Sequence, residues 1–347
     1  MLKLFCKDIT LIIPTLNRYM HVITYLNYLT NYNYGGAVIL ADSSKSEIFN
    51  KTKSYINNKV LNFNILHVDC KNLKNFEAIK KVSELVETEY CMFIPDDDFV
   101  IINTLEKCKN FLNQNLDYSA VGGITFLAIL NNYNKKINYL NRYKVNNIEH
   151  INVEQRINEC LTNYTVINYS LSRTAQWKKR WPQYGIDNPI GSEIIPACLI
   201  VAQGKVKMLK EIFCIREIHD NRYYFNNIID RILNLNWSKT LKTLLDAVYD
   251  ELKYKNKIDK NNLDKIILNG LKIKLIKEVK KLQSSKKKLN IISRILNRIN
   301  NFKNYFISDD HIIKNNLIIK RDRIINSKHK YFIMIENILN YIEKKYQ

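Results

Sequence analysis

The chain has 347 residues, 46% of them apolar, and its 54 lysines and arginines against 33 aspartates and glutamates give a formal net charge of +21. The apolar fraction excludes an intrinsically disordered chain, and only 8 glycines and 5 prolines exclude a collagen-like architecture. The length predicts two domains of about 150 residues, or one large α/β domain with an appendage.

The first 130 residues alternate between short apolar runs and segments with helical periodicity. Strands are predicted at 9–13, 37–41, 61–68 and 90–95, with one helix after Asn17 and another at 76–86. This order predicts a parallel sheet with helices on both faces. Ligands of such folds bind beyond the carboxyl ends of the strands, so the residues that follow each strand are the first candidates for a site.

The rest of the chain is predicted to contain both strands and helices up to about residue 225, and mainly helices after it. We expect a strand at 118–130, an exposed loop or short strands at 131–150, helices at 153–162 and 194–202, and a pair of short strands at 206–215. From about residue 226 the pattern is almost entirely helical, although 271–277 also alternates like a strand.

Three consecutive carboxylates, Asp96, Asp97 and Asp98, follow the strand predicted at 90–95. Like charges so close together repel unless a cation balances them, and Mg²⁺ or Mn²⁺ prefers carboxylate and phosphate oxygens. The alternative is an acidic surface turn in which one aspartate caps the next helix. The position after a buried strand favours a metal and phosphate site.

Polar residues also follow the first two strands. Asp42 is either an acceptor for a nucleotide or part of an Asx turn. Thr15 and Arg18 are candidates for nucleotide contacts, and Asn17 is either a contact or a helix cap. No G-x-G-x-x-G follows the first strand and no P-loop motif occurs, which disfavours a dinucleotide-binding Rossmann enzyme and a P-loop NTPase.

Three blocks of sequence, 9–18, 39–44 and 88–99, resemble the family-2-type glycosyltransferases in order and spacing. The resemblance is good over 8–128, loose over 150–220 and absent over 226–347. It implies a GT-A-type (Rossmann-like) α/β fold, a mixed sheet flanked by helices, with an α-helical C-terminal region. The domains it implies are a catalytic domain at 1–225, with a nucleotide-sugar half at 1–128 and an acceptor half at 129–225, and a basic helical region at 226–347.

The resemblance also implies roles for single residues. The residues that would hold a nucleotide-sugar donor, a UDP-sugar first, are Pro14, Thr15, Asn17, Arg18, Asp42, Ser43, Asp96 and Asp97. Asp98 and Asp96, within the family's D-x-D element, would bind Mn²⁺ or Mg²⁺, which would stabilise the diphosphate leaving group. In several related enzymes a histidine completes the metal site, which makes His219 a candidate ligand, although a lone exposed histidine commonly has no such role.

A catalytic base is needed because the acceptor hydroxyl must lose its proton. Glu193 stands where the family places this carboxylate, with Asp187 as second choice; the alternative for Glu193 is a first-turn carboxylate favoured by the helix dipole. Arg173 and Arg216 are candidates for phosphate contacts. The segment 177–181 only superficially resembles Gln-x-x-Arg-Trp, which argues against a processive synthase of the cellulose or chitin type.

The positive charge is concentrated in the C-terminal region. Residues 251–347 carry a net charge of +15 and residues 1–250 only +6. Three explanations are open, in decreasing order of preference: helices packed on the catalytic domain, docking on an anionic membrane surface, and nucleic-acid binding. No nucleic-acid module is recognisable, so no nucleic-acid partner is expected.

The seven cysteines include no Cys-x-x-Cys pair, and several lie in apolar runs, which predicts buried thiols in a reducing compartment. No signal peptide and no apolar run of ~18 residues is found. We therefore expect a cytoplasmic protein, or one peripheral on the cytosolic face of a membrane.

The favoured function is a metal-dependent glycosyltransferase of the hexosyltransferase type, inverting by family resemblance, that acts on a glycan, lipid-linked or protein acceptor in surface polysaccharide or glycoconjugate biosynthesis. A nucleotidyltransferase on a similar sheet would need a glycine-rich loop with a lysine after the first strand, which Pro14–Arg18 does not provide. A non-catalytic basic protein that binds a membrane or nucleic acid is the remaining alternative.

Overall fold

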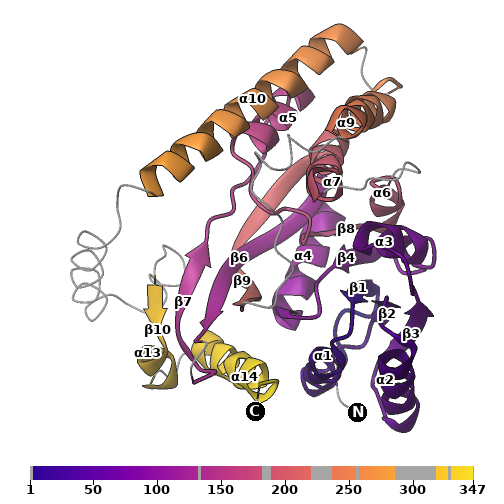
Figure 1. Ribbon diagram of the computed structural model, residues 1–347, viewed down its shortest axis with the longest axis vertical. Helices are drawn as coiled ribbons and strands as arrows, with labels where there is room; N and C mark the ends of the chain where they lie inside the picture. The colour runs from indigo at the N-terminus through magenta and orange to yellow at the C-terminus, as the bar shows by residue number, and fades with distance from the viewer. Residues whose placement is uncertain are drawn as a thin grey trace.

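The computed structural model describes residues 3–131, 134–181, 189–219, 237–254, 258–285, 318–326 and 330–346. Within these ranges one mixed sheet forms the centre of the molecule, with helices packed on both faces (Figure 1). The strand order is β10-β7-β6-β8-β4-β1-β2-β3, and β9 pairs with β6 and β5. The predicted mixed α/β sheet with flanking helices and a helical C-terminal region is confirmed.

The first half of the chain builds the parallel part of the sheet. Its strands are β1 (Ile9–Thr15), β2 (Ala37–Asp42), β3 (Asn64–Asp69) and β4 (Tyr90–Phe93), and its helices are α1 (Tyr19–Asn31), α2 (Ser46–Asn58) and α3 (Asn75–Ser83). Leu11 and Ile13 point into one buried cluster and Ile12 into the other. Both faces of β1 are therefore covered, which is why its sequence is continuously apolar.

The second half adds antiparallel pairs. Its elements are β5 (Asp98–Val100), α4 (Ile102–Gln114), β6 (Tyr118–Leu130), β7 (Ile137–Tyr143), α5 (Val153–Thr162), β8 (Leu171–Arg173), α6 (Thr174–Lys178), α7 (Pro189–Gln203) and β9 (Lys205–Ile218). The prediction of two short strands at 206–215 is wrong, because β9 is one strand that follows β6 along its length. The half-exposed stretch 208–211 lies beside shifts in register against β6, and it is this stretch that suggests a turn in the sequence.

The C-terminal region is packed onto the rest of the fold at two places (Figure 1). Its described elements are α9 (Trp237–Leu252), α10 (Lys260–Ser285), β10 (Ile318–Lys320), α13 (Arg321–Asn326) and α14 (Lys330–Lys344). α9 packs on α7 and α10 on α5, while β10 extends the sheet beside β7 and α14 packs on α1 and β9. The segment 271–277 is helical within α10. The predicted boundary at 225 lies outside the described residues.

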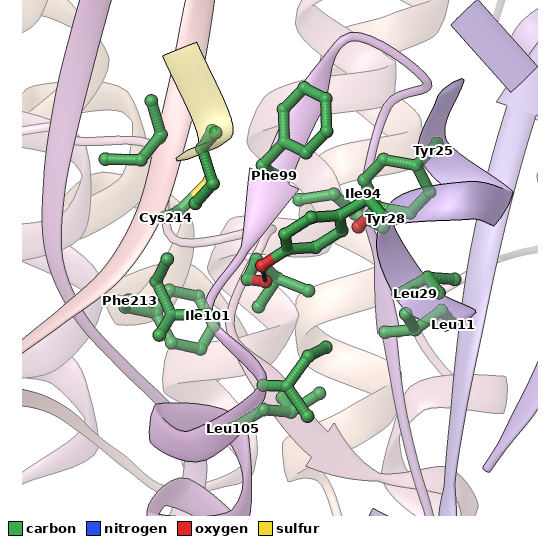
Figure 2. Packing of buried hydrophobic residues seen from close by; sticks show 14 of the residues in the cluster. Leu11, Tyr25, Tyr28, Leu29, Ile94, Phe99, Ile101, Leu105, Phe213 and Cys214 are labelled. Atoms are coloured by element: carbon green, nitrogen blue, oxygen red, sulfur yellow. Dashed lines mark hydrogen bonds between the residues drawn. The ribbon is translucent and has the colours of Figure 1, made fainter. Parts of the chain in front are cut away.

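An aromatic cluster fixes β5 against α1 (Figure 2). The ring of Phe99 packs on Tyr25 and Tyr28, with centroid distances of 5.4 and 5.1 Å, and the Tyr28 hydroxyl donates a hydrogen bond of 2.7 Å to the Val100 carbonyl. Because Phe99 directly follows Asp98, this packing holds the acidic segment at one edge of the sheet.

The seven cysteines are all buried, as predicted. Of the helices that the structure describes, none combines the length and the apolar character that a membrane crossing requires.

Candidate active site

The carboxyl ends of β1, β2 and β4 meet at one edge of the sheet. Thr15 pairs in register with Asp42, and the acidic segment follows β4 on the other side of β1. Asp96, Asp97 and Asp98 are only 3%, 8% and 2% exposed. The alternative of an acidic surface turn is therefore wrong, and none of the three caps α4, whose N-cap is Ile101.

The residues that follow β1 hold the first two aspartates. The Thr15 hydroxyl donates to Asp96 at 2.6 Å. One nitrogen of the Arg18 guanidinium donates to Asp96 at 3.0 Å and to Asp97 at 2.7 Å. The structure thus brings together four residues that the sequence singles out.

Burial and these partners act in opposite directions on the two carboxyls. Burial, together with the charge on Asp97, raises the pKa of Asp96 to about 6, against the lowering by Arg18 and Thr15. At Asp97 burial also favours the neutral form, but the hydrogen bond from His219 and the Arg18 guanidinium hold its pKa well below the usual range. Asp97 therefore ionises more readily than Asp96.

His219 follows β9 and lies 3.1 Å from Asp97 through its Nε2. Its side chain is 3% exposed, so the alternative of an exposed histidine without a role does not describe it. Within the described residues its Nδ1 is buried and has no hydrogen-bond partner. A buried imidazole with an unused nitrogen has a strong tendency to take a partner.

Asp98 is held by residues of β9, and not by the loop after β1 that holds Asp96 and Asp97. Its carboxylate accepts a hydrogen bond of 3.0 Å from Arg216 Nε and one of 3.1 Å from the Glu217 amide. Burial raises the pKa of Asp98 to about 7 despite the Arg216 guanidinium, which lowers it. Arg216 also lies over the Tyr169 ring at 4.7 Å. The metal-binding role of Asp98 stays a prediction.

Asp42 is fully buried at the end of β2. One oxygen accepts a bond of 2.9 Å from the Ser44 amide, the contact of an Asx turn, and the other lies 2.9 Å from His67 Nε2. The His67 ring stacks on Phe49 at 4.2 Å. The nucleotide contacts predicted for Asp42 and Ser43 remain predictions, as does that for Pro14, which pairs with Ala41 inside the sheet.

Asn17 joins two loops of the site. Its backbone has a positive φ of 56°, its amide donates to Ser44 Oγ at 2.6 Å, and its side-chain oxygen accepts from the Lys45 amide at 2.9 Å. The expected helix cap is wrong, because Arg18 is the N-cap residue of α1 and its side chain makes no cap bond. Asn17 fixes the loop after β1 against the loop after β2.

Three side chains form a metal-ligand cluster that the sequence only partly predicts. One potential ligand atom each from His21, Glu217 and His219 lies within 4.8 Å of the others. His21 and Glu217 are not among the candidates that the sequence predicts. Glu217 stands two residues before His219, a spacing that puts both on one face of a strand, and His21 stands three residues after Arg18, on the same side of a helix.

The donor set suits a divalent transition metal. Two imidazole nitrogens and one carboxylate match Mn²⁺ better than Mg²⁺, which prefers an all-oxygen shell. Burial, with the charges of Lys345 and Arg18, lowers the pKa of His21 to about 3, so its imidazole is neutral at pH 7 and keeps a lone pair for a metal. The residues present therefore fit such an ion.

Of the two candidate bases, the structure describes Glu193, whose charge acts on two buried tyrosines. Glu193 belongs to α7, and its charge raises the pKa of Tyr164 and of Tyr169, both of which burial raises first. The helix starts at Pro189, so Glu193 is in its second turn and the first-turn alternative is wrong. Asp187 lies outside the described residues, and the base roles remain predictions.

Two of the arginines have structural roles. Arg173 donates to the carbonyls of Leu112, Asn115 and Tyr118, where α4 ends, so it is not free for a phosphate. Arg180 is fully buried and donates to Ser172, Gln203 and the Ser119 carbonyl. The segment that superficially resembles Gln-x-x-Arg-Trp thus ties β8 to β6 and α7.

Comparison with known proteins identifies the fold. No family model and no curated protein matches the chain. Among solved structures, S. aureus TarS 1–349 in complex with UDP-GlcNAc matches with a TM-score of 0.54 at 12% identity, over 97% of this chain and 89% of that chain. A longer S. aureus TarS structure matches with a TM-score of 0.51 at 13% identity, over 98% of this chain and 55% of that chain.

A third match, the mannosyltransferase PcManGT from Pyrobaculum calidifontis in complex with GDP-Man and Mn²⁺, has a TM-score of 0.44 at 10% identity. The fold assignment rests on the two TarS structures. This chain is therefore an α/β protein with the TarS fold and a buried acidic, imidazole-containing site at the carboxyl edge of its parallel strands.

Proposed function

We propose that the protein is a glycosyltransferase that uses a nucleotide-sugar donor. The observation that carries the proposal is the convergence of Thr15, Arg18 and Asp96–Asp98 beside an imidazole cluster at one sheet edge. A fold neighbour, TarS, was solved with UDP-GlcNAc, a nucleotide sugar. Together these support donor binding at this edge and, with the sequence resemblance, a family-2-type GT-A enzyme.

The nucleotide would lie along the ends of β1 and β2. Asp42 would accept hydrogen bonds from the base or ribose, with Pro14, Thr15, Asn17, Arg18 and Ser43 around it. Asp96 and Asp97 would face the ribose or the donor sugar. Mn²⁺ or Mg²⁺, held by Asp98, Asp96 or His219, would supply positive charge to the diphosphate as it leaves.

The acceptor side would be built around α7. Glu193, or Asp187 in second place, would take the proton of the acceptor hydroxyl, which accords with the inverting outcome that the resemblance implies. A hexosyl donor, a UDP-sugar first, and a glycan, lipid-linked or protein acceptor in surface polysaccharide or glycoconjugate biosynthesis complete the proposal. The enzyme would work in the cytoplasm, or as a peripheral protein on the cytosolic face of a membrane.

A nucleotidyltransferase is less well supported. The segment after β1 is fixed by Asn17 and paired to carboxylates through Arg18, and it contains neither glycine nor lysine to hold a triphosphate. No observation among the described residues favours a non-catalytic scaffold over an enzyme.

The test is nucleotide release from a panel of UDP-sugars and GDP-mannose with and without Mn²⁺. We expect one donor to raise the melting temperature in the presence of Mn²⁺, and release to fall to background in Asp98→Asn. The matched control is Asp117→Asn, because that carboxylate is 57% exposed and pairs only with Lys205 among the ion pairs of the described residues. Failure of every donor to shift the melting temperature, or full activity of Asp98→Asn, would refute the proposal.

A further inference from the structure

Two residues that follow α14 reach into the metal-ligand cluster. Lys345 Nζ donates to Glu217 Oε2 at 2.5 Å, and the side chains of both are 0% exposed. The Tyr346 hydroxyl donates to the other oxygen, Glu217 Oε1, also at 2.5 Å. Both oxygens of the only carboxylate in the cluster are therefore engaged by side chains from a distant part of the chain.

Further contacts fix where the Lys345 ammonium lies. It is 5.4 Å from the centroid of Phe99, the residue after Asp98. Burial is the main cause of the low pKa of His21, and the charge of Lys345 lowers it further. The same charge makes a small contribution to the low pKa of Asp97, below those of His219 and Arg18. The Tyr346 ring lies 5.9 Å from the His21 ring and 6.1 Å from that of His219. The two side chains thus lie among the potential metal ligands.

The helix that carries these residues is anchored elsewhere. Phe332, Ile335, Ile338, Leu339 and Ile342 of α14 are buried in the core cluster that also contains β1 and β5. Arg321 also pairs with Glu336 and Glu343 of the same helix. Lys345 and Tyr346 lie beyond Lys344, where α14 ends, and their backbone amides donate to the Ile342 and Glu343 carbonyls. Leaving Glu217 therefore requires their side chains to move but not the packed helix.

We propose that His21, Glu217 and His219 form a divalent-cation site for which the Lys345 ammonium is a built-in competitor. A cation bound by Glu217 needs a carboxylate oxygen that Lys345 and Tyr346 now use. Two positive charges at one buried carboxylate also repel strongly. The ammonium keeps Glu217 neutralised until the cation replaces it, so the segment after α14 controls metal loading of the site.

This inference rests on the proposed function and deepens it, because His219 belongs both to the metal site proposed there and to this cluster, but its test needs no donor. We would titrate the protein with Mn²⁺ alone and follow the electron paramagnetic resonance signal of the free ion. Lys345→Met should tighten Mn²⁺ binding by about tenfold or more. Lys344→Met is the matched control, since it removes the same charge from the neighbouring exposed position and should leave the affinity unchanged.

A second variant locates the ion. Glu217→Gln in the Lys345→Met background should lose the gain in affinity. Equal Mn²⁺ affinity of the parent, Lys344→Met and Lys345→Met proteins would overturn the proposal, and so would a gain that persists without the Glu217 carboxylate.

A measurement on the unaltered protein covers the case in which Lys345→Met does not fold. Saturating Mn²⁺ should expose Lys345 to an amine-acetylating reagent and raise its modification, measured by mass spectrometry, relative to Lys344. Unchanged protection of Lys345 would overturn the competition. If Mn²⁺ displaces Lys345 but the protein releases no nucleotide from any donor, the competition is supported and only the proposed transferase activity is refuted.

Discussion

The Asp42 carboxylate shows how partners can outweigh burial at a single residue. Burial opposes its ionisation, yet the hydrogen bonds from His67 and Ser44 hold its pKa below the ordinary value of 3.8. A carboxyl whose pKa is lower in the folded than in the unfolded chain stabilises the fold above its unfolded pKa. That contribution is lost as the pH falls through the folded value.

Asp42→Asn should therefore flatten the acid limb of the stability curve. We expect the free energy of unfolding of the parent to fall more steeply than that of the variant below about pH 4, measured by urea denaturation at several pH values. Asp69→Asn is the control, because Asp69 pairs with Asp42 in register but is exposed. Parallel curves for the parent and Asp42→Asn would contradict the argument.

Among single residues, the sequence identifies those that directly follow strands. Asp42 and Asp96–Asp98 are recognisable because an apolar run ends just before them. Their partners are not recognisable: Arg216, which bonds Asp98, and His67, which lies beside Asp42, stand in segments whose pairing depends on the sheet register. The role of Asn17 as a link between two loops is likewise visible only when both loops are placed.

At the scale of elements, periodicity identifies those that bury one face or both. β1, β2 and β4 read as continuous apolar runs because almost all of their residues are buried, whereas β3 is partly exposed along its length. The sequence patterns do not single out α2, in which only Thr52 is fully buried and the apolar side chains are partly buried. β9 was divided in two because its middle is half-exposed. α14 is strongly amphipathic, and its apolar side fills the core between α1 and β9.

The packing of α14 predicts that it is integral to the fold. Ile338→Ala should lower the free energy of unfolding by about 2–5 kcal/mol, because Ile338 is fully buried and its removal leaves a cavity. Ile333→Ala on the same helix is the control, since Ile333 is 52% exposed, and should cost less than about 1 kcal/mol. Denaturant unfolding measures both, and equal losses would show that α14 is not packed as described.

At the scale of the whole molecule, the net charge is +21, and its positive residues include some that pair with buried carboxylates and others that are exposed on α10. Three cationic side chains form ion pairs with buried carboxylates: Arg18, Arg216 and Lys345. On α10, Lys272 and Lys280 are exposed and alternate every four residues with Leu268 and Ile276, each 44% exposed. The exposed lysines of this face carry positive charge that an anionic membrane surface attracts.

We therefore expect the protein to bind vesicles that contain phosphatidylserine and to be released by salt, measured by sedimentation. Lys272→Glu with Lys280→Glu should weaken binding by about tenfold or more, at about 1 kcal/mol for each lysine lost. Lys53→Glu with Lys59→Glu on the α2 side is the control of equal charge, because both lysines are exposed. An equal loss in the two variants would rule out a specific role for the α10 face.

The sequence by itself determined the parallel strands, the placement of acidic residues at their carboxyl ends and the helical character of the C-terminal region. These follow from local periodicity and from the rule that parallel strands end at a common edge. Only the tertiary structure decided that His21, Glu217 and His219 meet, and that Lys345 bonds Glu217 across a separation of 128 residues. Such contacts depend on which helix covers which end of the sheet, and no local pattern of side chains encodes that choice.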